Sequence, residues 1–543
     1  MSKRPQPVVG SDGEPLAEVA GIPSEGLSHR EILIVFSGLM TAMLLAALDQ
    51  TIVGTALPTI VSDLGGYNHL SWVVTAYLLT STATALLYGK ISDLYGRKRI
   101  FQFAIVIFLI GSALSGLSQN IGQLVVFRAI QGIGAGGLFV LALTIVGDIV
   151  SPRERGRYQG YFGAVFGLAT VAGPLIGGFL VDNLSWRWVF YVNLPVGAAA
   201  LIVTTLVLRD FHPHRRHQID YLGAVLMMAG VSALLLVSVW AGQEYPWGSW
   251  QIVGLWLAGT GLLGGFLLRE HTAKEPILPL RLFRNKVFDV ANAMGFIVGL
   301  AMFGAIVYLP IYFQLVRGAS PTISGLQILP LIIGLFGVSI GSGQIISKAG
   351  RYKIFPIVGT ALMTVGMFLM ASLHADTPYW QASLYMLILG MGIGAVLQVL
   401  VLAVQNAVTW EDLGTSTAAT TAIRSMGGTF GTSIFGAILT AQLAIWLPRL
   451  LPAGAPVGDL KGNITASPAA LKALAPALRD PIIESFVHSL HVVFLVAVPI
   501  AAAAFVLSLF LPEIDLRQTV RHDSKAGANG DAEAGAEAVP TLG

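Results

Sequence analysis

Long apolar runs, bounded by charged or turn-forming residues, dominate the chain. Each run has the length of about 17 to 25 residues that a helix needs to cross a bilayer. The runs are continuously apolar rather than alternating, which favours helices over the strands of a membrane barrel. The pattern therefore predicts an all-α polytopic membrane protein. The fourteen candidate spans cover residues 32–57, 70–89, 100–118, 121–147, 160–181, 189–208, 221–240, 251–268, 288–313, 323–346, 354–373, 380–403, 415–440 and 487–511.

Composition supports this class and excludes several others. Of the 543 residues, 55% are apolar and 11% are Asp, Glu, Lys or Arg, whereas soluble proteins carry about 25% of those four. The mean hydropathy is +0.73. The absence of Cys excludes disulfides, thiolate nucleophiles and Cys-ligated metal sites. A net charge of +3 gives no reason to expect nucleic-acid binding.

Lys and Arg gather in every second loop, which is the pattern of cytoplasmic loops. The loops after the second and fourth spans hold the clusters Arg97–Arg99 and Arg153–Arg157, for example, whereas the loops between them hold few cations. An even number of spans with both termini in the cytoplasm satisfies this alternation. The polar ends, residues 1–31 and 512–543, are predicted to be disordered cytoplasmic tails.

The chain also repeats itself in two places. Gly89–Arg99, after the second span, matches Gly343–Lys353, after the tenth, with the same glycine spacing and an offset of 254 residues. Gly132–Ala135 in the fourth span matches Gly392–Ala395 in the twelfth, with an offset of 260 residues. Internal repeats of this kind are typical of transporter halves.

This register implies a 6 + 2 + 6 organisation. The first six-helix half covers residues 32–208, and a helix pair with its cytoplasmic linkers, 209–287, is inserted after it. The second half covers 288–511 and includes a long external loop, 441–486.

Several motifs together resemble a known family. Gly89, Asp93, Gly96 and Arg97 fit Gly-x-x-x-Asp-x-x-Gly-Arg-basic-basic, which is similar to the signature between helices 2 and 3 of the major facilitator superfamily. The chain resembles in particular the fourteen-span drug:proton antiporters of the QacA/EmrB type, which usually carry Asn at the place of Gly54. The further matches are Leu48–Pro58, Arg128–Gly132, Gly173–Gly178, Ser185–Trp188 with Asn193 and Pro195, and Gln405–Asn406 with Arg424.

The resemblance implies the major facilitator fold and a role for the Gly89–Arg99 loop as a latch between the two halves on the cytoplasmic side. The gate residues would be Gly89, Asp93, Gly96, Arg97 and, in the second copy, Arg351. Ser347 stands in the second copy where Asp93 stands in the first, so its latch is expected to be weaker. The alternative is that the loop merely carries the positive charge of a cytoplasmic loop.

Asp49 is the one acid placed well inside a predicted span. A carboxylate there must be paired, hydrated, or protonated for part of a cycle. At about 1.5 Å per residue, Asp49 lies some 13 Å from the outer end of its span and Arg128 some 10 Å from the outer end of its own, so the two share a depth. We hypothesise that Arg128 keeps Asp49 ionised and that losing this contact lets the carboxyl take up a proton. The alternative is a structural carboxyl bonded to neighbouring backbone.

The other candidates have weaker sequence signals. In the antiporter motif, Gly173, Gly177 and Gly178 are expected to form a smooth helix-packing surface. Pro174 removes one backbone hydrogen bond and is expected to kink the helix. Each candidate substrate-cavity residue could equally pack in a core or, for Arg424, extend to the interface. The candidates for the cavity are Trp72, Tyr77, Gln131, Met302, Tyr308, Tyr312, Gln405 and Arg424.

These features predict a proton-coupled secondary exporter of amphipathic small molecules, a multidrug efflux protein of the cell membrane that works as a monomer by alternating access. No phosphate-binding Gly-x-x-x-x-Gly-Lys sequence occurs, so the proton gradient rather than ATP, and no cofactor or metal, would supply the drive. The alternatives are export of one physiological cargo, such as a lipid, siderophore or self-made antibiotic, import of a solute, a passive channel, and an intramembrane enzyme. The last lacks a Cys nucleophile, a metal-binding His pair and clustered carboxylates.

Overall fold

The structure is a computed structural model that describes residues 29–64, 70–208, 220–242, 244–273, 275–452, 471 and 474–516. Apart from one isolated bridge between Ala241 and Tyr245, the regular elements in these residues are helices. The long helices are α1 (His29–Leu64), α2 (Leu70–Tyr95), α3 (Arg97–Leu117), α4 (Ile121–Ile149), α5 (Pro152–Asn183), α7 (Asn193–Val207), α8 (Tyr221–Trp240), α9 (Trp250–Thr272), α10 (Lys286–Ile311), α12 (Leu329–Ala349), α13 (Ile354–Ala371), α14 (Tyr379–Ala407), α15 (Leu413–Leu450) and α18 (Pro476–Leu509). Shorter helices are α6 (Trp188–Tyr191) and α11 (Pro321–Gln327).

Twelve helices among the described residues are long and apolar enough to cross a membrane. Two further long helices, α2 and α5, lie outside that group. Both nevertheless pack inside the bundle, α2 against α4 and α5 against α1. The all-helical membrane architecture predicted from the hydrophobic pattern is thus confirmed.

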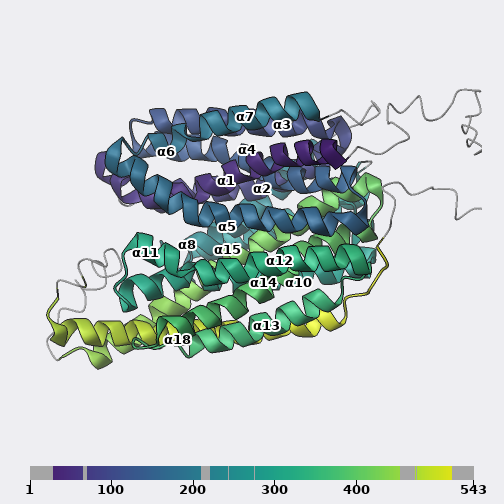
Figure 1. The fold of residues 1–543 in the computed structure, drawn as a ribbon. Coiled ribbons are helices and arrows are strands. Elements are labelled where there is room, and N and C mark those ends of the chain that lie inside the picture. Colours follow the sequence, from purple (N-terminus) through teal and green to yellow (C-terminus); the bar gives the residue numbers. More distant parts are fainter. Residues whose placement is uncertain are drawn as a thin grey trace, which may run out of the picture.

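The helices form two bundles that pack in the same way (Figure 1). In the first bundle α4 contacts α2 and α3, α1 contacts α5, and α7 contacts α1 and α3. In the second, α14 contacts α12 and α13, α10 contacts α15, and α18 contacts α10 and α13. The two bundles meet mainly where α2 contacts α15 and where α5 contacts α12, which is again a symmetric pair of contacts.

Glycine contacts fix the register of this repeat and correct the sequence alignment. Gly132, Gly134 and Gly136 approach α2, α3 and α2 in turn, so closely that a Cβ on each would fall within 3.0 Å of the neighbouring helix. The glycines that approach the equivalent helices α12, α13 and α12 are Gly390, Gly392 and Gly394. The offset in this helix is therefore 258 residues, and the predicted value of 260 is wrong. A shift of two residues turns a helix by about 200°, which would exchange the packed faces.

The two loop motifs lie at one end of the bundle, which we call the motif end and define by Gly96 and Gly350. Both glycines adopt a positive φ, of 95° and 72°, where the chain turns out of α2 and α12. At this end Gly89 of α2 lies against Gly414 of α15, and Gly343 of α12 lies against Gly156 of α5. The first glycine of each motif thus permits close contact with the opposite bundle.

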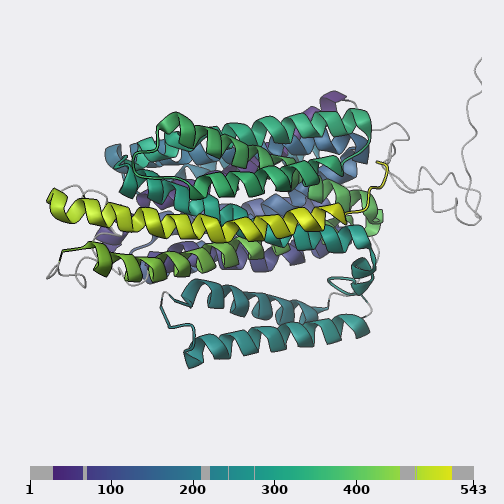
Figure 2. The ribbon, with the colours of Figure 1, turned by 90° about the horizontal axis from the view of Figure 1, so that it is seen from below.

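The pair α8 and α9 stands beside the two bundles rather than within either (Figure 2). The two helices pack on each other, and α8 also contacts α2 and α15, one helix from each bundle. Asp220, which caps α8, binds Arg269 of α9 at 2.9 Å. Burial alone would raise the pKa of the Asp220 carboxyl, but hydrogen bonds from the Gly223 backbone and Arg269 hold it below its ordinary value.

The far end of the second bundle differs from the prediction. The stretch 441–486 is not a loop throughout, because α15 continues to Leu450 and α18 already begins at Pro476. Leu443, Leu447 and Phe486 are buried there, so apolar packing carries both helices beyond the predicted spans. Residues 453–470 and 472–473 of this stretch, and most of the two predicted tails, lie outside the described residues.

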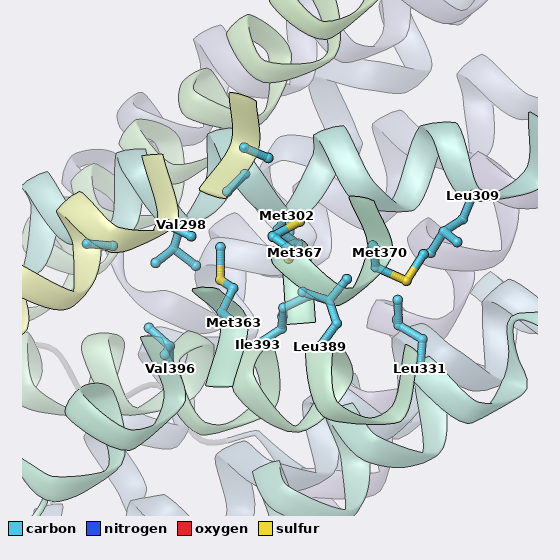
Figure 3. Close-up of a cluster of buried hydrophobic side chains, with 14 of the residues drawn as sticks. Val298, Met302, Leu309, Leu331, Met363, Met367, Met370, Leu389, Ile393 and Val396 are labelled. Carbon is cyan, nitrogen blue, oxygen red and sulfur yellow. The ribbon is translucent and has the colours of Figure 1, made fainter. Parts of the chain in front are cut away.

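The core of the second bundle is rich in methionine. Met302 of α10 packs with Met363, Met367 and Met370 of α13, and leucine and isoleucine side chains of α12 and α14 complete the cluster (Figure 3). Unbranched methionine side chains fill irregular gaps between helices. This cluster lies within one bundle rather than between the two.

Candidate functional site

Asp49, near the middle of α1, has no exposed surface and receives hydrogen bonds at both carboxylate oxygens. Arg128 Nη1 donates to Oδ2 over 2.6 Å. The amides of Gln131 and Asn193 both donate to Oδ1, over 2.8 and 2.9 Å. Such a set of donors stabilises the ionised form of a buried carboxylate. We call Asp49, Arg128, Gln131 and Asn193 the carboxylate cluster.

Arg128 of α4 is itself 1% exposed and is held on several sides. Its Nε donates to the Val73 carbonyl at 3.3 Å, and Nη1 also donates to Gln131 Oε1 at 2.7 Å. The guanidinium carbon lies 4.1 Å from the centre of the Tyr77 ring, which is cation–π geometry. The planar, multiply bonded guanidinium is thereby fixed in one orientation toward Asp49.

Asn193 is the member of the cluster to which the sequence assigned no role. It is the first residue of α7 and is 1% exposed. Its amide nitrogen also lies 3.0 Å from Ser112 Oγ, and that hydroxyl donates to the Phe190 carbonyl. The signal that could have identified it is the Ser185–Pro195 motif, since Trp186 and Arg187 of the same motif bind Asp63 at the far end of α1.

The antiporter motif sets the distance between α5 and α1 beside this cluster. A Cβ at Gly173 would lie 2.6 Å from Thr51 Cβ, and one at Gly177 would lie 3.1 Å from the Ile52 carbonyl oxygen. Gly178 differs, because nothing lies within 4 Å of the position of its Cβ. Pro174 lies within the continuous helix α5. Two of the three predicted packing glycines therefore contact the helix that carries Asp49.

The first loop motif joins the two bundles through a network of charges at the motif end. Arg97 forms ion pairs with Asp93 and with Asp148, the latter at 2.7 Å. Asp93 Oδ2 accepts hydrogen bonds from the backbone N–H and the hydroxyl of Thr415, at 3.0 and 3.1 Å. Thr415 stands at the start of α15, so one carboxylate bridges the two bundles. Gly96 supplies the turn and Gly89 the close helix contact described above.

The second copy of the motif uses a different bond. Ser347 and Lys348, near the end of α12, offer backbone carbonyls to the guanidinium of Arg153 on α5, at 3.0 and 2.9 Å. Cations are favourable at the C-terminal end of a helix, where the carbonyls lack intrahelical partners. Arg351 is exposed and forms no ion pair among the described residues. The structure thus places Arg351 at the motif end without bringing it into contact with the opposite bundle.

The predicted cavity residues separate into groups. Gln131 belongs to the carboxylate cluster, and the ring of Tyr77 packs against the Arg128 guanidinium, as described. Gln405 of α14 donates to the Leu143 carbonyl of α4 and so joins the two bundles near the motif end. Trp72 packs edge-on against Trp240 of α8, at 5.4 Å between ring centres.

Three others are packed in the core of the second bundle. Met302 is buried in the methionine cluster, Tyr308 donates to the Thr432 carbonyl at 2.7 Å, and Tyr312 donates to the His374 carbonyl at 2.8 Å. This arrangement uses their side chains for packing, so the structure gives no support to their assignment as substrate contacts.

Arg424 is half-buried on α15 and is placed against α10, where a Cβ at Gly299 would collide with its backbone oxygen. Its guanidinium makes no hydrogen bond or ion pair among the described residues. It differs in this respect from Arg97 and Arg128, which are paired with carboxylates.

A comparison with known families decides the class. The sequence profile of the Major Facilitator Superfamily matches residues 39–432. The chain belongs to the major facilitator superfamily. It is therefore a transporter-family protein and a multi-pass protein of the cell membrane.

Relatives within the superfamily include named drug transporters. The chain is 39% identical over 525 residues to the multidrug transporter protein MdtP of Bacillus subtilis, covering 92% of this chain and 96% of that one. It is 44% identical over 483 residues to an uncharacterised MFS-type transporter of Mycobacterium tuberculosis, covering 89% and 70% of the two chains. Among solved structures, the proton:xylose symporter XylE has a TM-score of 0.59 at 15% identity, covering 90% of this chain and 97% of that one, which supports the fold alone.

Proposed function

We propose that this protein is a proton-coupled exporter of amphipathic small molecules, a multidrug efflux protein of the fourteen-span drug:proton antiporter type. In this proposal α2 and α5 span the membrane together with the twelve other long helices, in a 6 + 2 + 6 arrangement. Both termini and the motif end are cytoplasmic, and the protein works as a monomer without a cofactor. The named multidrug relatives support the efflux part of the proposal.

The observation that carries the coupling is the buried pair of Asp49 and Arg128, 2.6 Å apart. Ionisable groups inside a membrane protein mark ion pathways and proton relays more often than structural roles. In the state described here the carboxylate is fully satisfied as an anion. Movement that separates Arg128 from Asp49 would remove that stabilisation and let the carboxyl bind a proton.

One such carboxylate sets a limit on the energy available. Exchange of one proton for a neutral molecule draws on about 2.3 kcal/mol per 100 mV of membrane potential and about 1.4 kcal/mol per pH unit. A monovalent cationic substrate would cancel the electrical part. Neutral, zwitterionic or anionic amphipathic substrates therefore suit this chain better than multivalent cations.

The network of Asp93, Arg97 and Thr415 supports the alternating-access part of the proposal. It joins the two bundles at the motif end, together with the glycine contact of Gly89 with Gly414. Opening this end toward the cytoplasm requires these bonds to break. The described arrangement accordingly represents the state closed to the cytoplasm.

Arg424 is the residue we assign to the substrate. Met426 of the same helix packs against the cluster formed with α8, and residues two apart on a helix lie about 200° from each other. Arg424 therefore faces away from the inserted pair and toward α10, where a Cβ at Gly295 would lie 4.0 Å from the Arg424 Cβ. An unpaired guanidinium there favours substrates with an acidic or polar end.

The decisive test is transport by the purified full-length chain in liposomes with an imposed pH gradient. We expect the copies inserted inside-out to carry amphipathic substrates into the liposomes while the pH gradient collapses. Asp49→Asn should abolish both the uptake and the collapse. A matched control is Asp376→Asn, because Asp376 is exposed in the loop after α13. If Asp49→Asn retains full proton-driven transport, the coupling assignment is wrong.

A second candidate is export of one self-made product. The chain is 35% identical over 512 residues to a transporter named for the acurin A biosynthesis cluster of Aspergillus aculeatus. A chemically diverse substrate panel separates the two possibilities. Transport of many unrelated members supports efflux of drugs, and transport of none supports a single dedicated cargo.

A further inference from the structure

Every polar contact that the structure gives to the Asp49 carboxylate comes from a donor. Arg128 donates to Oδ2, and Gln131 and Asn193 donate to Oδ1. This shell suits the ionised carboxylate, which only accepts hydrogen bonds. A protonated carboxyl has one O–H that must donate, so a neighbour has to become an acceptor when the proton arrives.

The three neighbours differ in their ability to accept. A guanidinium has no acceptor atom, which excludes Arg128. Gln131 Oε1 is already bonded to Arg128 Nη1 at 2.7 Å. Asn193 Oδ1 is buried and has no hydrogen-bond partner. Asn193 therefore holds the unused acceptor of the carboxylate cluster.

A rotation of the Asn193 amide would bring this oxygen to Asp49. The terminal torsion of Asn is roughly two-fold, so a half-turn exchanges the oxygen and the NH2 group with little movement of the heavy atoms. Ser112 Oγ, which lies 3.0 Å from the amide nitrogen, can reorient its hydroxyl toward the oxygen that replaces it. In each orientation one end of the amide binds Asp49 and Ser112 while the other end is unpaired. The second orientation also takes the Ser112 hydroxyl away from the Phe190 carbonyl, so the first is favoured until Asp49 binds the proton.

We propose that Asn193 is a two-state positioning residue for the coupling proton: its amide nitrogen donates to the ionised Asp49, and after half a turn its amide oxygen accepts from the protonated Asp49. The proton comes from water and is bound at Oδ1, Arg128 remains protonated, and the cluster gains one positive charge. This inference rests on the proposed role of Asp49 in proton coupling. It assigns to α7 a part in the cycle that the sequence motifs did not indicate.

The test is infrared difference spectroscopy between low and high pH on the full-length protein in lipid nanodiscs, with and without ¹³C-labelled asparagine. We expect a protonated-carboxyl band that Asp49→Asn removes, accompanied by a label-sensitive shift of a side-chain amide C=O band. Asn193→Leu should remove the amide shift, whereas the control Asn292→Leu, at a buried amide on α10, should leave it unchanged.

The outcomes separate this inference from the proposed function. A carboxyl band from Asp49 without a label-sensitive amide shift overturns the role of Asn193 and leaves the role of Asp49 intact. No carboxyl band from Asp49 overturns the proposed proton coupling and this inference together. If Asn193→Leu does not fold, the smaller Asn193→Ser variant makes the same comparison, because it also removes the amide whose shift is measured.

Discussion

The contact between α1 and α5 offers a sharp test, because one methyl group added at Gly173 would strike the helix that carries Asp49. In Gly173→Ala the new Cβ would lie 2.6 Å from Thr51 Cβ and 3.2 Å from the Ile52 nitrogen. Ordinary contacts begin at 3.4 Å, so the two helices must separate locally by roughly 0.8 Å. The hydrogen bond from Thr51 Oγ1 to the Ala169 carbonyl, 2.9 Å long, would also be disturbed.

Overpacking of this kind costs about 1 to 3 kcal/mol. If the strain falls on the state closed to the cytoplasm and not on the opposite state, the balance between them shifts by about 5- to 150-fold. We therefore expect a several-fold or larger loss of transport in liposomes and a lower Tm in detergent. The matched control is Gly178→Ala, which gains the same methyl group on the same helix with nothing within 4 Å.

A compensating variant strengthens the test. Thr51→Gly combined with Gly173→Ala removes the Thr51 side-chain atoms that the new methyl group would strike, and we expect it to recover part of the lost transport. The reasoning is refuted if Gly173→Ala and Gly178→Ala have the same Tm and the same transport rate, because a difference between the two sites is what the close approach requires.

Three further predictions concern charges. Asp93→Asn should weaken the closure at the motif end, seen as faster labelling of a single cysteine that replaces the buried Ser416 of α15 in this Cys-free chain, whereas Arg351→Ala should have no effect. Equal labelling in both variants would contradict the latch. Arg128→Lys keeps the positive charge but loses the planar guanidinium that binds Asp49, Gln131 and the Val73 carbonyl at once. We therefore expect the protein to fold but transport to fall at least tenfold, a change of about 1.4 kcal/mol. Transport close to wild type would show that charge alone suffices. At the far end of α1, hydrogen bonds from Trp186 and then Arg187 lower the pKa of Asp63 below its ordinary value of 3.8, so the ionised form stabilises the fold above that pH and its contribution is lost as the pH falls further. Asp63→Asn should accordingly lower the Tm near neutral pH, and the Tm values of variant and wild type should converge in acid; a constant difference at all pH values would refute this assignment.

Much of the fold followed from the hydrophobic pattern, because membrane helices must be long and apolar regardless of their partners. Each predicted span is helical, although 189–208 is divided between α6 and α7 and 323–346 between α11 and α12. The span 221–240 coincides with α8 at both ends. The ends were less well predicted where packing rather than lipid determines them. Thus α15 continues to Leu450 because its last turns bury leucines against α18.

The candidate site was predictable as far as it depended on how deep each residue lies along its helix. Counting residues from the span ends placed Asp49 and Arg128 at one level, and the structure brings them together. It did not reveal Asn193, which reaches Asp49 from a helix start 144 residues away. Counting residues also could not show that Met302 and Tyr308 pack inside one bundle rather than between the two bundles. That distinction depends on the rotation of each helix about its axis.

The two contacts at the motif end are related by the repeat but differ in chemistry. One is held by the carboxylate of Asp93 and the other by Arg153 on backbone carbonyls, and only the first can lose its charge on protonation or be weakened by a competing cation at a carboxylate. A molecule built from two similar halves therefore has one contact that responds to pH and to competing cations and one that responds to neither. If the motif end is cytoplasmic, as proposed, a fall in cytoplasmic pH would act on the two contacts asymmetrically, loosening that of α2 with α15 and not that of α5 with α12.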